Sequence, residues 1–132
     1  IRYQPRSRGL GDVYKRQVDI IRHNMNVVGH PHVTVEQAKV SDYVPRAPRE
    51  HFSMVLADPP YDLPDDAVAE MLDALIPLLA DEAAVVIERH RESPETNWPR
   101  GFTPTGQKLK KRLYGIARMD MATFSRAELD DN

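Results

Sequence analysis

The sequence has no cysteine, which excludes disulfides, thiolate catalysis and zinc sites that use thiolate ligands. It also has no apolar run near the ~20 residues that a membrane-spanning helix needs. Neither sign of charge dominates, because 18 basic residues stand against 20 acidic ones. We therefore expect a soluble cytoplasmic protein whose 132 residues form one small domain or part of one.

The most informative stretch is an apolar run that ends in the tetrapeptide Asp-Pro-Pro-Tyr. Residues Phe52–Ala57 have the apolar, β-branched and aromatic composition of a buried strand. The strand must stop at Asp58, because Pro59 and Pro60 have no N–H for a sheet ladder and each fixes its own φ. We therefore predict a stiff, extended loop over residues 58–61 at the carboxyl end of a buried strand. Ligands bind at that edge in open α/β sheets.

The chemistry of this loop follows from its hydrogen-bond acceptors. Its prolines lack N–H groups, so carbonyl oxygens dominate the polar surface, and Asp58 adds a carboxylate. Asp58 and the Pro59 carbonyl are suited to hold an exocyclic amino group, while Pro60 sets the shape of the loop. Tyr61 offers a flat ring on which a base can stack. An amine held in this way directs its lone pair at an electrophile, so catalysis would be mostly positioning.

The segment after the motif predicts a strand–helix–strand unit. Apolar residues recur there at helical spacing, at Val68, Met71, Leu72, Leu75, Ile76 and Leu79. Pro77 is expected to kink the last turn of this helix. A turn at residues 81–82 leads to a second buried strand over residues 83–88, and such a unit is right-handed by default. Glu88 ends that strand near the loop, either as an acid of the site or as the partner of a neighbouring arginine.

The flanking segments give weaker patterns. Upstream, we predict a helix over residues 18–28 that Gly29 caps, a strand over residues 33–36, and a short helix that begins at Ser41. Downstream, Trp98 and Phe102 interrupt a polar stretch, either as anchors on the core or as residues that stack on RNA; we favour anchors.

The C-terminal part predicts a closing antiparallel hairpin. Its strands span residues 109–114 and 116–124, and Gly115 makes the turn between them. Residues 125–132 are predicted to be a frayed acidic tail.

The first 17 residues differ from the rest in charge. They hold five of the 18 basic residues and one of the 20 acidic ones, so the remainder has 13 basic and 19 acidic residues and a net charge of −6. Residues 1–17 show no helix or strand periodicity. Such a basic arm could contact RNA phosphates; we instead interpret it as adapter or vector sequence that is foreign to the domain.

Asp58-Pro59-Pro60-Tyr61 after an apolar strand resembles the catalytic motif of amino methyltransferases that use S-adenosylmethionine. Four further segments are similar to the RsmD family, whose members methylate the N2 amine of a guanine in bacterial 16S ribosomal RNA. These segments cover residues 85–89, 93–95, 98–102 and 111–115. The resemblance extends over residues 18–124.

The resemblance implies a Rossmann-like α/β methyltransferase domain that ends in an antiparallel hairpin and lacks its N-terminal third. The glycine-rich loop and ribose-binding acid of the family would lie upstream, so we expect this chain alone to be inactive. It further implies a monomer without a metal, with 16S ribosomal RNA or a small-subunit assembly intermediate as its partner. The implied residues are Asp58, Pro59, Pro60 and Tyr61 for catalysis, and Gln37, Ala38 and Asp58 for S-adenosylmethionine. For RNA, the candidates are Tyr61 and a basic cluster that could also be no more than a solvated strand; the cluster consists of Lys108, Lys110, Lys111 and Arg112.

Two other functions stay open at this point. The first is a related enzyme with the same motif that methylates adenine N6 in DNA or RNA. The second is a non-catalytic α/β binding module in which the Asp-Pro-Pro-Tyr segment is only a turn.

Overall fold

The computed structural model of the chain describes residues 11–29 and 31–130. These residues belong to two compact units, one within residues 5–39 and one that consists mainly of the chain from Val40 onward. The sheet and all elements that follow it in sequence lie in the larger unit.

The smaller unit contains one long helix, α1 (Gly11–Val28). It ends as predicted at Gly29, which has a φ of 73° and donates its N–H to the Met25 carbonyl at 2.8 Å. Its start was predicted wrongly, because the helix already includes residues 11–17. The strand expected over residues 33–36 is also absent: residues 33–39 have no regular secondary structure. Alternating polarity cannot form a strand without a hydrogen-bonded neighbour, and the described part of this unit has no second strand.

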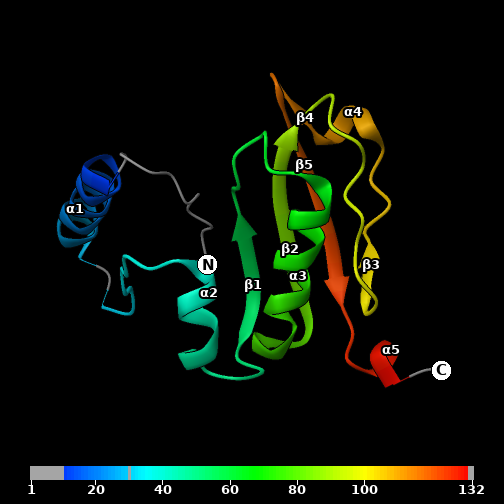
Figure 1. Cartoon of the computed structure of the whole chain (residues 1–132), viewed down its shortest axis with the longest axis horizontal. Helices are drawn as coiled ribbons and strands as arrows, with labels where there is room; N and C mark the ends of the chain where they lie inside the picture. The colour runs from blue at the N-terminus through cyan, green and yellow to red at the C-terminus, as the bar shows by residue number, and fades with distance from the viewer. Residues whose placement is uncertain (1–10, 30, 131–132) are drawn as a thin grey trace. The chain divides into compact units, whose positions relative to one another are not determined.

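The larger unit is built on a mixed five-stranded sheet with the order β1-β2-β5-β3, and β4 pairs with the other end of β5 (Figure 1). The strands are β1 (Phe52–Ala57), β2 (Leu79–His90), β3 (Phe102–Pro104), β4 (Leu113–Tyr114) and β5 (Ala117–Phe124). β1 and β2 are parallel, and all pairs that involve β5 are antiparallel. The predicted α/β class is therefore confirmed, with a mixed sheet.

The predicted strand–helix–strand unit is present. It consists of β1, the helix α3 (Asp65–Leu75), a 3-10 turn η2 (Ile76–Leu78) and β2. The backbone changes from α to 3-10 geometry just before Pro77, as expected of a residue that cannot donate to the preceding turn. The turn expected at residues 81–82 is instead an irregularity within β2, where Glu82 has a φ of 63° and the register to β1 shifts.

The chain enters β1 through α2 (Val40–Tyr43) and the 3-10 turn η1 (Val44–Arg46), close to the short helix predicted from Ser41. At the other end, the predicted hairpin is much shorter than expected. Its first half is a helical turn, α4 (Leu109–Arg112), and only Leu113–Tyr114 pairs with β5. Residues 125–132 were predicted to be a frayed tail, which is wrong for the described part of this segment. Ala127–Asp130 forms α5, and Leu129 packs against the core.

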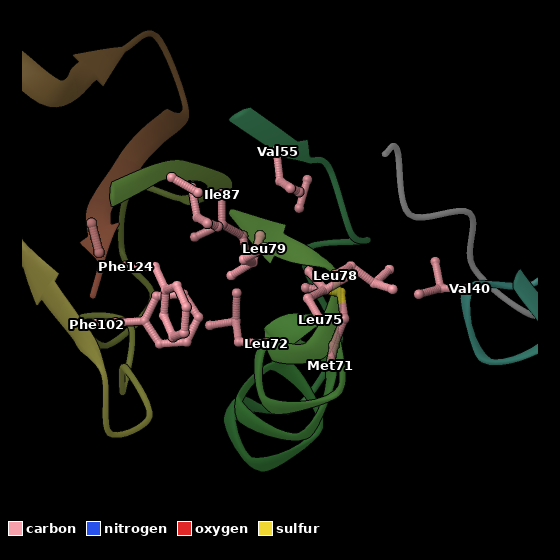
Figure 2. Packing of buried hydrophobic residues seen from close by; sticks show 14 of the residues in the cluster. Val40, Val55, Met71, Leu72, Leu75, Leu78, Leu79, Ile87, Phe102 and Phe124 are labelled. Atoms are coloured by element: carbon pink, nitrogen blue, oxygen red, sulfur yellow. The ribbon is translucent and has the colours of Figure 1, made fainter. Parts of the chain in front are cut away.

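The hydrophobic core lies between α3 and one face of the sheet (Figure 2). Apolar side chains of α3, which include Met71, Leu72 and Leu75, point at residues of β1 and β2 such as Val55 and Ile87. The opposite face of β1 leaves Met54 and Leu56 more than half exposed. This difference follows from the two-residue period of a strand, which sends neighbouring side chains to opposite faces.

Trp98 and Phe102 are anchors, as predicted. The two rings lie 5.6 Å apart, and Phe102 in turn packs on Phe124 of β5 at 5.3 Å. Gly101 allows this close approach, because a Cβ at this position would lie 2.9 Å from Phe124 Cε2 and its φ is 97°. The polar stretch is thus fixed to the core by its aromatic residues. None of the helices in the described ranges is both long and apolar enough to cross a membrane.

Two leucine substitutions should show that only one face of the sheet contributes a hydrophobic core. Leu72→Ala removes a side chain that is 0% exposed and should lower the free energy of unfolding by about 2–5 kcal/mol. Leu56→Ala removes the same atoms from a side chain that is 57% exposed and should cost less than about 1 kcal/mol. Urea unfolding measures both values. Similar losses for the two variants would contradict a core that lies on one face only.

Candidate active site

The Asp-Pro-Pro-Tyr loop lies where the sequence predicted it, at the carboxyl end of a parallel strand. Ala57 ends β1 opposite Ile87 of β2, so the loop begins beside residues 88–90. Pro59 is fully buried, whereas Asp58 and Tyr61 are half-buried. The Leu63 N–H donates to the Pro60 carbonyl at 3.0 Å, which closes a turn directly after the motif.

Tyr61 meets two side chains from the end of β2. Its hydroxyl donates a long hydrogen bond of 3.4 Å to Glu88 Oε2, and its ring packs edge-on against His90 with the ring centres 5.4 Å apart. Burial, followed by the charge and the acceptor of Glu88 and then the charge of Asp58, raises the pKa of Tyr61 above its ordinary value of 10.0. Two strand ends therefore bring a neutral phenol and two carboxylates into one cluster, and the predicted proximity of Glu88 to the loop is confirmed.

Arg89 holds the backbone of the loop in place. Its guanidinium donates to the carbonyls of Pro60 at 3.1 Å, Tyr61 at 3.3 Å and Leu63 at 2.8 Å. The residue is only 3% exposed, and it follows Val85 and Ile87 on the face of β2 that packs against the core. A buried charge must be compensated by hydrogen bonds, and here three carbonyl dipoles supply them.

Sequence reasoning missed this role of Arg89. The signal was that Arg89 is charged although the two-residue period of its strand places it on the same face as the buried Val85 and Ile87. Such a residue requires acceptors nearby, and a loop with two prolines presents carbonyls that have few local N–H donors. The two observations together identify the contact.

A second polar cluster supports the C-terminal hairpin. Arg118, which is 2% exposed, donates to Asp120 through Nε at 2.8 Å and through Nη2 at 2.8 Å. It also donates to the carbonyls of Ser93 at 2.5 Å and Pro94 at 2.9 Å. Burial favours protonation of Asp120, but the hydrogen bonds from Arg118 and Thr96 outweigh it and lower the pKa of this carboxyl.

Arg112, predicted as an RNA contact, belongs to this same cluster. Its guanidinium forms ion pairs with Glu95 at 2.7 Å and Asp120 at 2.6 Å, and its side chain is 13% exposed. The hydrogen bond to Glu95 favours the charged form, so the pKa of Arg112 is raised. Its interactions inside the protein therefore stabilise α4 and the hairpin.

The other predicted site residues are three lysines of the larger unit and two residues of the smaller one. Lys108, Lys110 and Lys111 are exposed at the start of and along α4. Gln37 is exposed and Ala38 half-buried, and both lie in the irregular segment of the smaller unit. A part in cofactor binding stays a prediction for both residues. No three His, Asp or Glu side chains among residues 11–29 and 31–130 form a group that could hold a metal ion.

The arrangement can bind and orient a donor-rich group. Carbonyl and carboxylate oxygens line the loop, a phenol lies beside them, and the guanidinium of Arg89 keeps three of the carbonyls fixed. These groups suit an amine attached to a flat ring system. The carboxylates of Asp58 and Glu88, which lie next to Tyr61, also suit a cofactor with a cationic centre and an amino group.

Comparison with known proteins gives a family and a fold. The profile of the family described as conserved hypothetical protein 95 matches residues 7–122. A search of the curated proteins finds no match.

Solved structures match with low sequence identity. A protein from Haemophilus influenzae described as a "putative methylase" is 18% identical, with a TM-score of 0.66 over 85% of this chain and 68% of that chain. A conserved hypothetical protein from Streptococcus pyogenes is 18% identical, with a TM-score of 0.68 over 86% of this chain and 68% of that chain. A "putative methyltransferase" from Escherichia coli is 16% identical, with a TM-score of 0.60 over 82% of this chain and 56% of that chain.

Replacement of Arg89 by methionine should loosen the loop. The change removes the guanidinium donor from three carbonyls, of which only that of Pro60 keeps a second donor among the described residues, the Leu63 N–H, so we expect the free energy of unfolding to fall by about 1–3 kcal/mol. Amide hydrogen exchange at Leu63, whose N–H bonds to Pro60, should accelerate more than exchange in the middle of β2.

Arg126→Met is the matched control for this variant. Arg126 donates to the carbonyls of Ile76 and Leu79 at the far end of the sheet. Its loss should destabilise the fold without a selective effect on Leu63. Equal exchange at Leu63 in both variants would contradict a local role for Arg89.

The raised pKa of Tyr61 can be measured by the ultraviolet absorbance of tyrosinate. The difference between the wild type and Tyr61→Phe isolates this residue from the other four tyrosines. Glu88→Gln should bring the pKa of Tyr61 closer to 10.0, whereas Glu92→Gln, at an exposed acid just past β2, should not. Because the folded pKa is raised, the stability that Tyr61 contributes is complete below its unfolded pKa and is lost as pH rises through the folded pKa. An unchanged Tyr61 titration in Glu88→Gln would refute the contact.

Proposed function

Since the chain belongs to the conserved hypothetical protein 95 family, which is RsmD-like, we propose that it transfers a methyl group from S-adenosylmethionine to the N2 amine of a guanine in 16S ribosomal RNA. One observation supports this most directly. An acceptor-rich Asp-Pro-Pro-Tyr loop is held rigidly at the carboxyl end of a parallel strand, which is the edge of an α/β sheet where cofactors bind.

In this proposal, residues of the loop hold the amine. Asp58 and the Pro59 carbonyl accept its two N–H bonds, so the nitrogen lone pair is directed out of the plane of the base. Tyr61 stacks on the base, and Glu88 with His90 keeps the tyrosine ring in one orientation. Arg89 holds the backbone of the loop, so the acceptors keep a fixed position relative to the bound amine.

The bound cofactor would supply a methyl group on a cationic sulfur. Asp58 would bind it, and the part of Gln37 and Ala38 in cofactor binding stays a prediction. Guanine N2 is a weak nucleophile because its lone pair conjugates with the ring, and the acceptors of the loop raise its electron density. The amine must lose one proton, and the Asp58 carboxylate is the acceptor closest to it in this arrangement.

The polymer would be held outside the loop. Lys108, Lys110 and Lys111 are exposed and can contact phosphates, while Arg112 keeps α4 in place through Glu95 and Asp120. The base must leave its stack to reach the loop, as in other enzymes that modify bases. An unpaired guanine is therefore the expected target.

The decisive experiment replaces the carboxylate of the loop. In a version of the protein that carries its natural upstream sequence, Asp58→Ala should reduce methyl transfer to unmodified 16S ribosomal RNA by about 100-fold or more, because a positioned acceptor is removed. The product is N2-methylguanosine, which mass spectrometry of digested nucleosides detects. Asp73→Ala, at an exposed carboxylate of α3, is the control and should leave the rate unchanged.

Two additional measurements test the cofactor and the substrate. Calorimetry with S-adenosylmethionine is performed on this chain and on a version that carries its natural upstream sequence, since the chain covers 56% of the Escherichia coli protein. Absence of binding to both versions would refute the cofactor. A DNA substrate is assayed in parallel, and N6-methyladenine in place of N2-methylguanosine would favour the related adenine enzyme. Full activity of Asp58→Ala would favour a non-catalytic binding module.

A further inference from the structure

The tip of the β4–β5 hairpin, residues 113–117, presents two large apolar side chains to solvent. Tyr114 and Ile116 are each 63% exposed. They flank Gly115, whose φ of 61° suits the first position of a two-residue turn between Tyr114 and Ala117. We refer to residues 113–117 as the hairpin tip.

The hairpin tip adjoins the candidate active site. Ala117 pairs with His90, the residue whose ring packs against Tyr61. The Arg91 N–H donates to the Ile116 carbonyl at 2.7 Å, and Arg91 Nη1 donates to the Gly115 carbonyl at 3.1 Å. Figure 1 shows the tip at the same edge of the sheet as the carboxyl ends of β1 and β2. A polymer whose base enters the loop would therefore pass close to Tyr114.

The hairpin tip is held rigidly by the polar cluster beneath it. Arg118 directly follows the tip and is tied to Asp120, Ser93 and Pro94. Arg112 directly precedes it and is tied to Glu95 and Asp120. A tip whose backbone is already held in place loses little backbone entropy when a ligand binds to it.

The charge next to the hairpin tip favours a polyanion. α4 leads directly into β4 and carries exposed Lys110 and Lys111, with exposed Lys108 just before it. Arg91, which donates to the Gly115 and Ile116 carbonyls, is exposed as well. An aromatic ring among cations is the combination with which proteins bind single-stranded nucleic acid, by stacking on bases and by attraction to phosphates. A protein partner would instead be expected to require a wider apolar patch with few lysines.

We propose that Tyr114 is a stacking platform for an unpaired RNA base that neighbours the nucleotide in the active site. Ile116 extends the apolar surface beside the ring, and the lysines of α4 hold the phosphates of the same strand. The inference rests on the proposed function, because only that function places a bound RNA strand near the Asp-Pro-Pro-Tyr loop. It adds a preference for single-stranded RNA over duplex RNA.

The test measures RNA affinity by fluorescence anisotropy on the full chain without S-adenosylmethionine. The probes are a labelled single-stranded RNA oligonucleotide and the blunt duplex formed with its complement. Tyr114→Ala should weaken binding to the single strand by about 5- to 150-fold, since stacking contributes about 1–3 kcal/mol per base. Binding to the duplex should change by less than about twofold, because paired bases offer no free ring face.

Matched variants separate stacking from other effects. Tyr114→Phe keeps the flat ring and should bind like the wild type, whereas Tyr114→Leu keeps apolar area without the ring and should behave like Tyr114→Ala. Met54→Ala removes a similarly exposed apolar side chain from β1 and should have no effect. Circular dichroism of each variant verifies that it is folded.

Salt dependence distinguishes the ring from the lysines. The double variant Lys110→Ala/Lys111→Ala should reduce the slope of log affinity against log salt by about 0.7 for each phosphate that the protein no longer neutralises. Tyr114→Ala should lower the affinity without a change in that slope.

Equal affinity of the wild type and Tyr114→Ala for the single strand would overturn the inference. Equally weakened binding to single strand and duplex would do so as well, as would wild-type binding that shows no preference for the single strand. Failure of the proposed function is detected separately, because this assay measures RNA affinity and not methyl transfer. A decrease in affinity specific to Tyr114, together with no detectable methyl transfer by the version that carries its natural upstream sequence, would uphold the stacking platform and refute the reaction.

Discussion

The contact between Arg89 and the carbonyls of Pro60, Tyr61 and Leu63 is the interaction on which the candidate site depends. Two consecutive prolines make the loop stiff, but they also remove two backbone donors from a region that is partly buried. A guanidinium from the neighbouring strand supplies the missing donors. The buried charge and the unpaired carbonyls would each be costly alone, and each satisfies the other.

The end of β2 has different functions on its two faces because of the strand period. Arg89 points to the core side and holds the backbone of the loop, whereas Glu88 and His90 point to the other side and hold the ring of Tyr61. The next strand repeats the arrangement, since Arg118 of β5 pairs with Arg89 in the sheet and is also buried. Carbonyl groups and the Asp120 carboxylate compensate these two adjacent cations. Side chains of the sheet thus hold the backbone in place at the Asp-Pro-Pro-Tyr loop and beside the hairpin tip alike.

The sequence predicted the elements whose patterns are local and missed those that depend on distant partners. The strand before Asp58, the helix after Pro64 and the anchoring of Trp98 and Phe102 all followed from apolar spacing or aromatic burial. Residues 109–112 were predicted as a strand but form a helical turn, because Arg112 reaches back to Glu95 and forward to Asp120. Residues 33–36 alternate like a strand and remain irregular, since alternation does not supply a pairing neighbour.

By itself the sequence determined where the loop begins, how stiff it is and that acceptors dominate it, because prolines act on φ and on backbone donors within one or two residues. It also determined which face of α3 is buried, through the helical spacing of its apolar residues. Only the tertiary structure decided that Arg89, and not Glu88 alone, completes the site, and that Tyr114 lies beside it. Both depend on the register between strands that are far apart in the chain, and no local pattern encodes that register.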